Sequence, residues 1–215
     1  NVSEVYEHLR TKAGDSEAKE LLDLIEQKTI YYVSTYDLEK LVTKEQFKEV
    51  MRDGAQWCLK NGYATKRDIE HIEDHGKIDW ADPEKVSTKA IQRGFDQIGT
   101  LGSGNHYLEI QVVNKENIYD AEAAKAMGIS KPGQIVIMVH CGSRGFGHQI
   151  GTDYLRIFLD VMPKYGIEIL DRELACAPFN SPEGQDYYKA MACAANMAFA
   201  NRQVITYRIR EVFSR

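Results

Sequence analysis

The chain is organised around one glycine-rich stretch, Gly99-Thr100-Leu101-Gly102-Ser103-Gly104-Asn105-His106-Tyr107-Leu108-Glu109. Glycine tolerates positive φ and allows close approach to the backbone, so such a loop can wrap an anion with its N–H groups. The apolar alternation of Leu108, Ile110 and Val112 then predicts a strand. His106 therefore lies where a loop ends and a rigid strand begins, which is a suitable place for a ligand to a bound group.

A second stretch repeats this arrangement. Residues 134–139 predict a buried strand, which runs into His140-Cys141-Gly142-Ser143-Arg144-Gly145-Phe146-Gly147-His148-Gln149. Two strands that each join a glycine-rich loop and each offer a histidine indicate one shared site for metal and phosphate, with His106 and His140 as the ligands. Arg144, in a Gly-Ser-Arg-Gly turn, is placed to fork onto a phosphate, and Arg93 is a weaker candidate for the same role.

The residues alone leave blander interpretations open. Neither loop matches a standard nucleotide motif, and both could be tight turns with buried, hydrogen-bonded histidines. Arg144 could instead form a surface salt bridge, and Glu109 could form a cross-strand ion pair rather than accept a hydrogen bond from a base or hydroxyl. His71 and His75 have a metal-binding spacing, but their acidic neighbours favour a solvated face. For His148, which follows glycines at a predicted helix start, we favour a structural role.

Composition places the chain among ordinary globular proteins. Its 215 residues are 43% hydrophobic and 27% charged, with a net charge of -5, which argues against a broad nucleic-acid-coating surface but leaves a local basic patch open. No apolar run approaches the roughly 20 residues that span a bilayer, and no signal peptide is visible. The four cysteines form no CxxC pair, so we expect free thiols in a reducing compartment. Because the first residue is Asn1, we expect that the chain is processed or cut from something longer.

Local signals predict helices at both ends of the chain. Helices are expected over 2–12 and from Asp15 or Ser16, followed by a β-like run at 30–33. A capping box at 43–46 opens another helix that Asn61-Gly62 closes, and Ser181-Pro182-Glu183 opens an alanine-rich helix that we expect to continue to Val212. We therefore expect an α+β fold, in which helical N- and C-terminal parts surround a β-containing middle, as a single domain over 1–215.

Three stretches in this order resemble the RtcB family, the RNA-splicing ligases that act on tRNA halves and other broken RNAs. They are Arg93-Gly94 with the stretch 99–109, then 140–149, and then Ser181-Pro182-Glu183-Gly184-Gln185-Asp186-Tyr187 leading to Ala195-Asn196 and Asn201-Arg202-Gln203. The resemblance covers most of the chain and is weakest in its first helices. It implies the mixed architecture of that family.

The resemblance also implies an activity. The family joins an RNA 3′-phosphate or 2′,3′-cyclic phosphate to a 5′-hydroxyl, in tRNA splicing and RNA repair, with GTP and two Mn²⁺ ions as cofactors. A histidine is guanylylated, GMP passes to the RNA 3′-phosphate, and the 5′-hydroxyl displaces GMP. The implied partners are RNA, GTP and archease, the implied location is the cytoplasm, and no membrane is involved.

The family's roles carry over to particular residues of this chain. His106 resembles a ligand of one manganese and His140 a ligand of the other. The segment Asn105, His106, Tyr107, Leu108 and Glu109 resembles the lining of the guanylate site, and Arg93 and Arg144 resemble contacts to RNA phosphates.

The chain also departs from the family pattern. It has no Asp-x-x-Cys near its start and no histidine after His148, so the family's other metal ligands and its nucleophilic histidine are absent. The catalytic residue is thus unknown here, and we expect an internal fragment that does not ligate alone. A phosphate- or RNA-binding module without catalysis, and a metal-dependent phosphoesterase using His106 and His140, are the alternatives.

Overall fold

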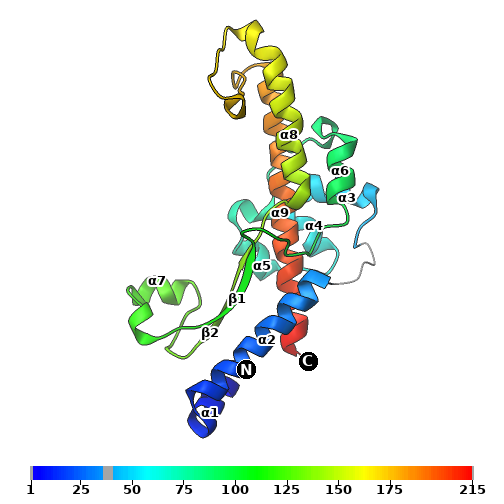
Figure 1. Ribbon diagram of the computed structural model, residues 1–215. Helices are drawn as coiled ribbons and strands as arrows, with labels where there is room; N and C mark the ends of the chain where they lie inside the picture. Colours follow the sequence, from blue (N-terminus) through cyan, green and yellow to red (C-terminus); the bar gives the residue numbers. More distant parts are fainter. Residues whose placement is uncertain (1, 36–40, 215) are drawn as a thin grey trace. The chain divides into compact units, whose positions relative to one another are not determined.

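The computed structural model describes residues 2–35 and 41–214 (Figure 1). Helices dominate, and the described residues contain one two-stranded sheet, which confirms the predicted α+β class. The elements are α1 (Val2–Ala13), α2 (Asp15–Thr35), α3 (Lys44–Asp53), α4 (Ala55–Lys60), α5 (Lys66–Glu70), α6 (Thr88–Gly94), β1 (Tyr107–Val112), α7 (Ala121–Ala126), β2 (Ile135–His140), α8 (Arg144–Val161) and α9 (Pro182–Ser214). Short 3-10 turns lie at Glu73–Gly76, Pro83–Lys85, Lys115–Asn117, Met162–Tyr165 and Arg172–Leu174.

The chain divides into two compact units. Unit 1 holds the described residues of 1–36, 101–140 and 209–215, and unit 2 holds those of 37–100 and 141–208. The prediction of a single domain over 1–215 is not decided by this division and stays a prediction. No helix in the described ranges combines the length and the apolar character needed to cross a membrane.

Unit 1 is built around the strand pair. β1 and β2 are antiparallel, with Tyr107 opposite His140 at one end and Val112 opposite Ile135 at the other. Helix α2 supports β1, because the Glu26 carboxylate accepts a hydrogen bond from the Ile110 amide at 2.6 Å. The register therefore fixes His140 beside the residue that follows His106, at the open end of the hairpin.

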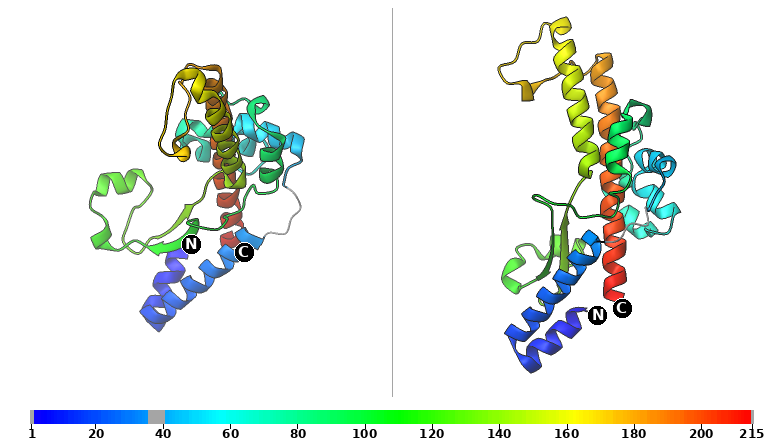
Figure 2. Two further views of the ribbon diagram at one scale, coloured as in Figure 1. Left: turned by 45° about the horizontal axis from the view of Figure 1, so that its top comes forward. Right: turned by 45° about the vertical axis from the view of Figure 1, so that its right-hand side comes forward.

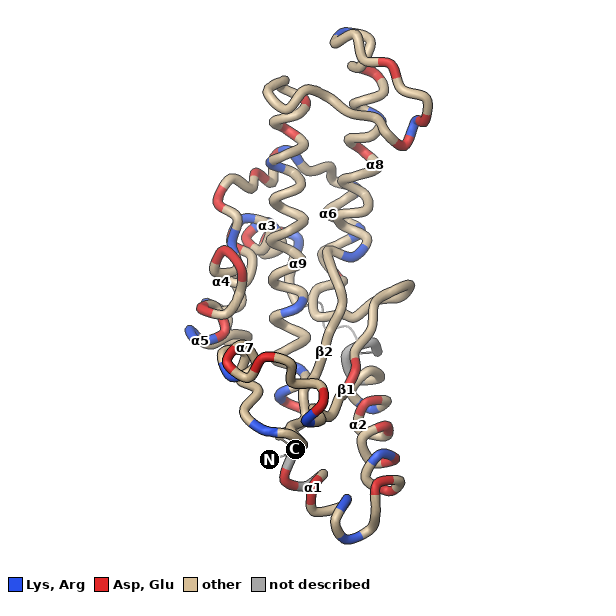
Figure 3. The backbone as a smooth tube through the Cα atoms, turned by 90° about the vertical axis from the view of Figure 1, so that its left-hand side faces the viewer, with Lys and Arg blue, Asp and Glu red and all other residues tan. Residues whose placement is uncertain are grey.

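Two predictions within unit 1 are wrong. The β-like run at 30–33 belongs to helix α2, which continues to Thr35. No glycine or proline interrupts residues 15–35, and buried Thr29 bonds its hydroxyl to the Ile25 carbonyl at 2.7 Å, so helix continuity outweighs β propensity. Strand β2 is only partly covered: Met138 and His140 are exposed and the others are intermediate. Figure 3 shows this strand without charged residues, so an apolar run did not imply burial here.

Unit 2 contains the main core, which surrounds α9. Phe47 of α3 packs edge-on against Phe146 of α8, with ring centroids 5.1 Å apart. Figures 1 and 2 show α8 running beside α9. The buried residues on α9 include Ala190, Ala192, Ala198 and Ala200, whereas Ala194 and Ala195 are intermediate. The helix begins as predicted, with the Ser181 hydroxyl accepting from the Gly184 amide at 3.1 Å.

Other helix boundaries refine the predictions. Thr43 forms the predicted capping box with Gln46, but the helix it opens breaks at Gly54 into α3 and α4. Gly54 has φ 54° and ψ −131°, a conformation suited to glycine. A Cβ at this position would also lie 2.2 Å from the Gly76 carbonyl oxygen, so two backbone segments meet here with no room for a side chain.

This contact generates a stability prediction. We expect Gly54→Ala to lower the free energy of unfolding by about 2 to 6 kcal/mol, because backbone strain of roughly 1–3 kcal/mol adds to an overpacking cost of roughly 1–3 kcal/mol. Gly62→Ala is the matched control, since Gly62 also has positive φ (82°) but nothing lies within 4 Å of an added Cβ. Urea unfolding of both variants measures the difference, and equal losses would show that the Gly76 contact is unimportant.

Candidate functional site

The two predicted metal ligands lie close together in unit 1. The rings of His106 and His140 have centroids 6.1 Å apart and planes tilted by 43°. His140 is exposed and His106 is partly exposed, so neither packs into an apolar interior. The Tyr107 ring stacks on His140 at 5.3 Å and supports it from one side. The interpretation as two buried histidines in tight turns is therefore wrong.

A backbone contact indicates the tautomer of His106. Its Nδ1 lies 2.9 Å from the Leu101 carbonyl oxygen, which can only accept a hydrogen bond. Nδ1 therefore carries the proton, and in the neutral ring Nε2 keeps its lone pair. A hydrogen bond from one ring nitrogen to a backbone carbonyl is the usual way in which a metal-binding histidine is oriented. This observation supports His106 as a ligand through Nε2.

The pair fits part of a metal site. Metal ions in two-metal sites lie roughly 3.5–4 Å apart, so rings at 6.1 Å can each bind one ion of a pair. In the parts of the chain that the structure describes, no group of three or more His, Cys, Asp or Glu side chains could hold a metal. Further ligands would have to come from elsewhere in a longer protein, as the sequence predicts.

Unit 2 carries the two predicted phosphate contacts. The prediction that Arg144 lies in a turn is wrong. Arg144 is the first residue of α8, with φ 56°. Its Nε donates to the Thr100 hydroxyl at 3.1 Å, and burial lowers the pKa of its half-buried guanidinium from the ordinary value. Among the described residues no carboxylate lies within 4.0 Å of the Arg144 guanidinium, so the salt-bridge alternative fails.

Arg93 is held by a polar relay. Its Nη1 donates to Oε1 of buried Gln149 at 2.8 Å, and the Gln149 amide donates to Asp153 at 2.7 Å. Ser87 donates to the second oxygen of Asp153 at 2.6 Å. The Arg93 Nε lies 3.6 Å from the place where a Cβ on Gly145 would be, so Arg93 runs beside the first turn of α8. Arg93 and Arg144 thus offer positive charge next to the glycine loop.

Comparison with known proteins decides the family. A model of the family described as tRNA-splicing ligase RtcB matches residues 2–215. The chain belongs to the RtcB family. It is 54% identical over 172 residues to the tRNA-splicing ligase RtcB of Methanococcus maripaludis, covering 80% of this chain and 35% of that protein. It is 57% identical over 170 residues to the RNA-splicing ligase RtcB homolog 1 of Entamoeba dispar, covering 79% and 31%.

A third relative gives the same picture. The RtcB of Archaeoglobus fulgidus is 48% identical over 174 residues, which cover 81% of this chain and 36% of the relative. The chain thus spans about a third of the length of these RtcB relatives.

The side chains of residues 105–109, the segment predicted to line a guanylate site, differ in their exposure. Asn105 and Tyr107 are exposed, whereas Leu108 is 2% exposed and belongs to the core of unit 1. Glu109 is half-buried and accepts a hydrogen bond from Gln111 at 2.7 Å, and among the described residues it forms no ion pair. Strand alternation therefore places the side chains of Tyr107 and Glu109 on one face of β1 and that of Leu108 on the other.

Three further histidines, His71, His75 and His148, belong to unit 2. His71 and His75 are exposed near α5, and His71 Nδ1 contacts the Arg67 carbonyl at 2.7 Å. This exposure matches the predicted solvated face. His148 lies in the second turn of α8 and is exposed. None of the three belongs to a described cluster that could hold a metal.

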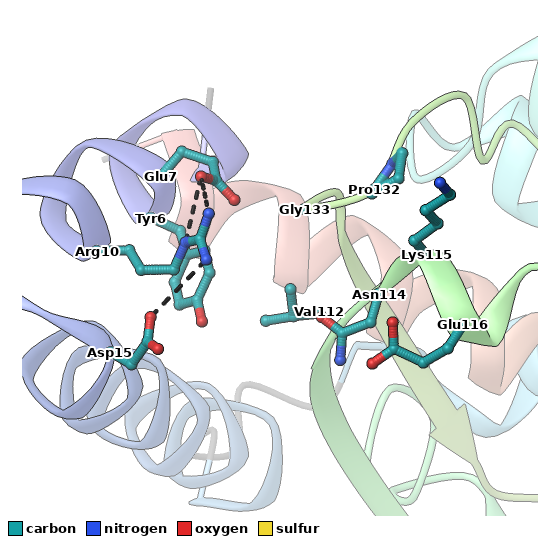
Figure 4. Close-up of a pocket in the computed structure, with 10 residues that line it drawn as sticks. All are labelled: Tyr6, Glu7, Arg10, Asp15, Val112, Asn114, Lys115, Glu116, Pro132 and Gly133. Atoms are coloured by element: carbon teal, nitrogen blue, oxygen red, sulfur yellow. Dashed lines mark hydrogen bonds and ion pairs between the residues drawn. The ribbon is translucent and has the colours of Figure 1, made fainter.

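Unit 1 also contains a cavity of about 410 Å³ that holds none of the predicted site residues (Figure 4). It lies at the Val112 end of the strand pair, opposite to the His140 end. Its Arg10 is already paired, with Glu7 at 3.0 Å and Asp15 at 3.9 Å. The charge of Arg10 is therefore already balanced by carboxylates and is not available to a phosphate in this cavity.

Sequence reasoning gave no role to Asn201 of α9, which is fully buried in unit 2. Its side chain contacts both glycine-rich loops, at Gly99 and Thr100 and at Cys141 and Gly142. The available signal was a carboxamide in the alanine-rich helix, but that pattern does not say which backbone groups the carboxamide binds.

The thiols of this RtcB chain generate a second prediction. Burial raises the pKa of Cys58 and of Cys193 to about 12, and it raises the pKa of Cys141 despite the opposing charges of Arg202 and Arg144. Cys176 is exposed. Because the thiolate is the reactive form, we expect iodoacetamide at pH 8 to modify Cys176 and to spare the other three.

Mass spectrometry of the alkylated peptides measures this. A shift from 9.0 to about 12 leaves Cys58 and Cys193 roughly a thousand-fold less thiolate, and burial slows them further. The control is the same reaction in urea, where all four should react. Rapid native modification of Cys141 would show that the second glycine loop opens readily.

Proposed function

We propose that the protein containing this chain is an RNA ligase, which joins RNA 3′-phosphate or 2′,3′-cyclic phosphate ends to 5′-hydroxyl ends. Membership of the RtcB family, whose relatives carry the name tRNA-splicing ligase, supports this proposal. The observation that carries it is the His106–His140 pair at 6.1 Å, at the end of a strand pair that joins two glycine-rich loops. tRNA splicing and RNA repair are the processes that we propose for it.

We propose Mn²⁺ and GTP as its cofactors. The tautomer of His106 supports a ligand role for Nε2, and His140 would bind the second ion. Bound Mn²⁺ would polarise phosphoryl oxygens and offset negative charge that develops at phosphorus. Asn105, Tyr107 and Glu109 would contact the guanylate, while the nucleophilic histidine would lie outside this chain. A cytoplasmic location and a partnership with archease belong to the same proposal.

Arg93 and Arg144 would hold RNA phosphates. Each guanidinium has one nitrogen fixed by a neutral acceptor, Gln149 for Arg93 and Thr100 for Arg144, so its other donors stay available for an anion. Among the residues that the structure describes, the carboxylate of Asp153 reaches Arg93 only through Gln149, and no carboxylate forms an ion pair with the guanidinium directly. Such preset forks would orient an RNA end and would lose little rotamer freedom on binding.

A phosphate- or RNA-binding module without catalysis describes the isolated chain best. The observation that favours it is the absence of a third metal-binding side chain near His106 and His140 among the described residues. The isolated 215-residue chain would then bind RNA ends without ligating them.

The ligase proposal predicts guanylylation. Full-length protein incubated with Mn²⁺ and GTP labelled in its α-phosphate should take up guanylate covalently, and His106→Ala and His140→Ala should each reduce the label by roughly 100-fold or more, since even removal of outer-shell partners costs roughly 10- to 100-fold. His71→Ala is the control, because His71 is exposed and remote in sequence from both loops. An unlabelled parent would remove the ligase proposal, and release of inorganic phosphate from 3′-phosphate RNA would point to a phosphoesterase.

The phosphate contacts predict a salt dependence. Arg144→Gln should weaken binding of single-stranded RNA that ends in a 3′-phosphate and should lower the slope of log affinity against log salt by about 0.7, the share of one phosphate contact. Arg156→Gln is the matched control, since Arg156 lies on the same helix and is exposed. Fluorescence anisotropy at several salt concentrations measures both slopes. Equal slopes for the two variants would show that Arg144 touches no phosphate.

A further inference from the structure

We propose that Asn201 is a positioning residue for the metal- and phosphate-binding side chains, because its carboxamide fastens the two glycine-rich loops to each other. This inference rests on the proposed function, and it adds a residue that the sequence motifs left without a role. Asn201 lies on α9 and is fully buried, so water cannot replace the hydrogen bonds that it makes.

The oxygen of Asn201 holds the first loop. Oδ1 accepts hydrogen bonds from the amides of Gly99 at 2.7 Å and Thr100 at 3.1 Å. Gly99 needs its positive φ of 73° to present both amides, and a Cβ there would lie 2.5 Å from Val204 of the same helix. The first loop therefore lies directly against α9 at the place where Asn201 receives it.

The nitrogen of Asn201 holds both loops at once. Nδ2 donates toward the carbonyl oxygens of Gly142 at 3.0 Å and Thr100 at 3.3 Å, and it lies 3.6 Å from Sγ of Cys141. An asparagine supplies two acceptor lone pairs and two N–H donors in one planar group. Aspartate would keep only the acceptors and alanine neither, so few side chains could serve both loops from this position.

Neighbouring arginines reinforce the same loops. Arg202 donates to the Cys141 carbonyl at 3.3 Å, and Arg208 donates to the Gly99 carbonyl. Thr100, which Asn201 fixes by its backbone, accepts the Nε hydrogen bond of Arg144 on its hydroxyl. One hydrogen bond thus separates the fastened loop from a proposed phosphate contact.

Chain connectivity links the fastened loops to the histidines. Leu101, whose carbonyl orients His106, is the residue after Thr100. His140 is the residue before Cys141. Asn201 therefore holds the two backbone segments that lead into the proposed metal ligands, and its loss would let both segments move independently.

The same helix supplies a matched control. Asn196 is also fully buried, and its carboxamide accepts from the Ile78 amide at 2.7 Å and donates to the carbonyls of Met51, Arg52 and Ile78. It therefore serves as many backbone groups as Asn201 does, but none of them lies in the glycine-rich loops. A purely structural role predicts that the two asparagines behave alike.

The experiment compares Asn201→Ala, Asn201→Asp and Asn196→Ala in the full-length protein. Binding of Mn²⁺ is measured by EPR of the free ion, and amide hydrogen exchange is measured at residues 99–100 and at Ile78. We expect Asn201→Ala to weaken Mn²⁺ binding at least roughly 10-fold and to speed exchange at 99–100. Asn196→Ala should speed exchange at Ile78 and leave Mn²⁺ binding unchanged at a similar loss of stability.

Asn201→Asp separates the two halves of the contact. It keeps the acceptor for the Gly99 and Thr100 amides, so exchange there should stay slow, but it loses the donor to Gly142, so Mn²⁺ binding should still weaken. This variant also decides the matter if Asn201→Ala fails to fold. Equal Mn²⁺ affinities in Asn201→Asp and the parent, or equal losses in the Asn201 and Asn196 variants, would overturn the positioning role.

The proposed function fails separately. A parent protein that binds no Mn²⁺ and takes no guanylate would refute the ligase proposal, and the metal-positioning role would fall with it. The exchange rates at residues 99–100 would still show whether Asn201 fastens the loop. A parent that binds Mn²⁺ and takes the label, with an Asn201 variant like the Asn196 variant, would refute only the inference.

Discussion

The structure of unit 2 depends on buried carboxamides that α9 offers to the backbone of irregular segments. Asn196 serves the segments around Met51 and Ile78, Asn201 serves both glycine-rich loops, and Gln203 donates to the Tyr63 carbonyl at 2.9 Å. A buried loop cannot bond to water, so each of its backbone groups needs a protein partner. Small buried residues between these side chains, such as Ala200, let the loops approach α9 closely enough to form hydrogen bonds with the side-chain amides.

Much of the fold could be predicted because local signals agree with the tertiary structure. The capping residues Thr43 and Ser181 begin helices as expected, and both predicted strands exist with boundaries within one residue. The two failures in unit 1 share a cause. Residues 30–33 and strand β2 are apolar and β-branched, and such a run does not reveal whether it continues a helix or how much of a strand is covered.

The site residues could be predicted where a reactive side chain lies at the junction of a strand and a loop. His106 and His140 stand at strand ends beside glycines, which predicted their proximity, and Arg144 stands beside the glycines of the second loop. The partners that set these groups could not be predicted, because Leu101, Gln149 and Asn201 reach them through tertiary contacts that leave no local pattern. Leu108 belongs to the segment that resembles a guanylate site, but its side chain is buried, so membership of a motif does not show that a side chain faces a ligand.

The two contacts of the Asn201 nitrogen also describe how the chain is assembled. Because one nitrogen reaches the carbonyls of both Thr100 and Gly142, the backbone leaves unit 2 and re-enters it at nearly the same point. Residues 101–140 thus form a segment whose two ends lie next to each other. Segments with adjacent ends are the ones that a domain can gain or exchange with little change to its own packing.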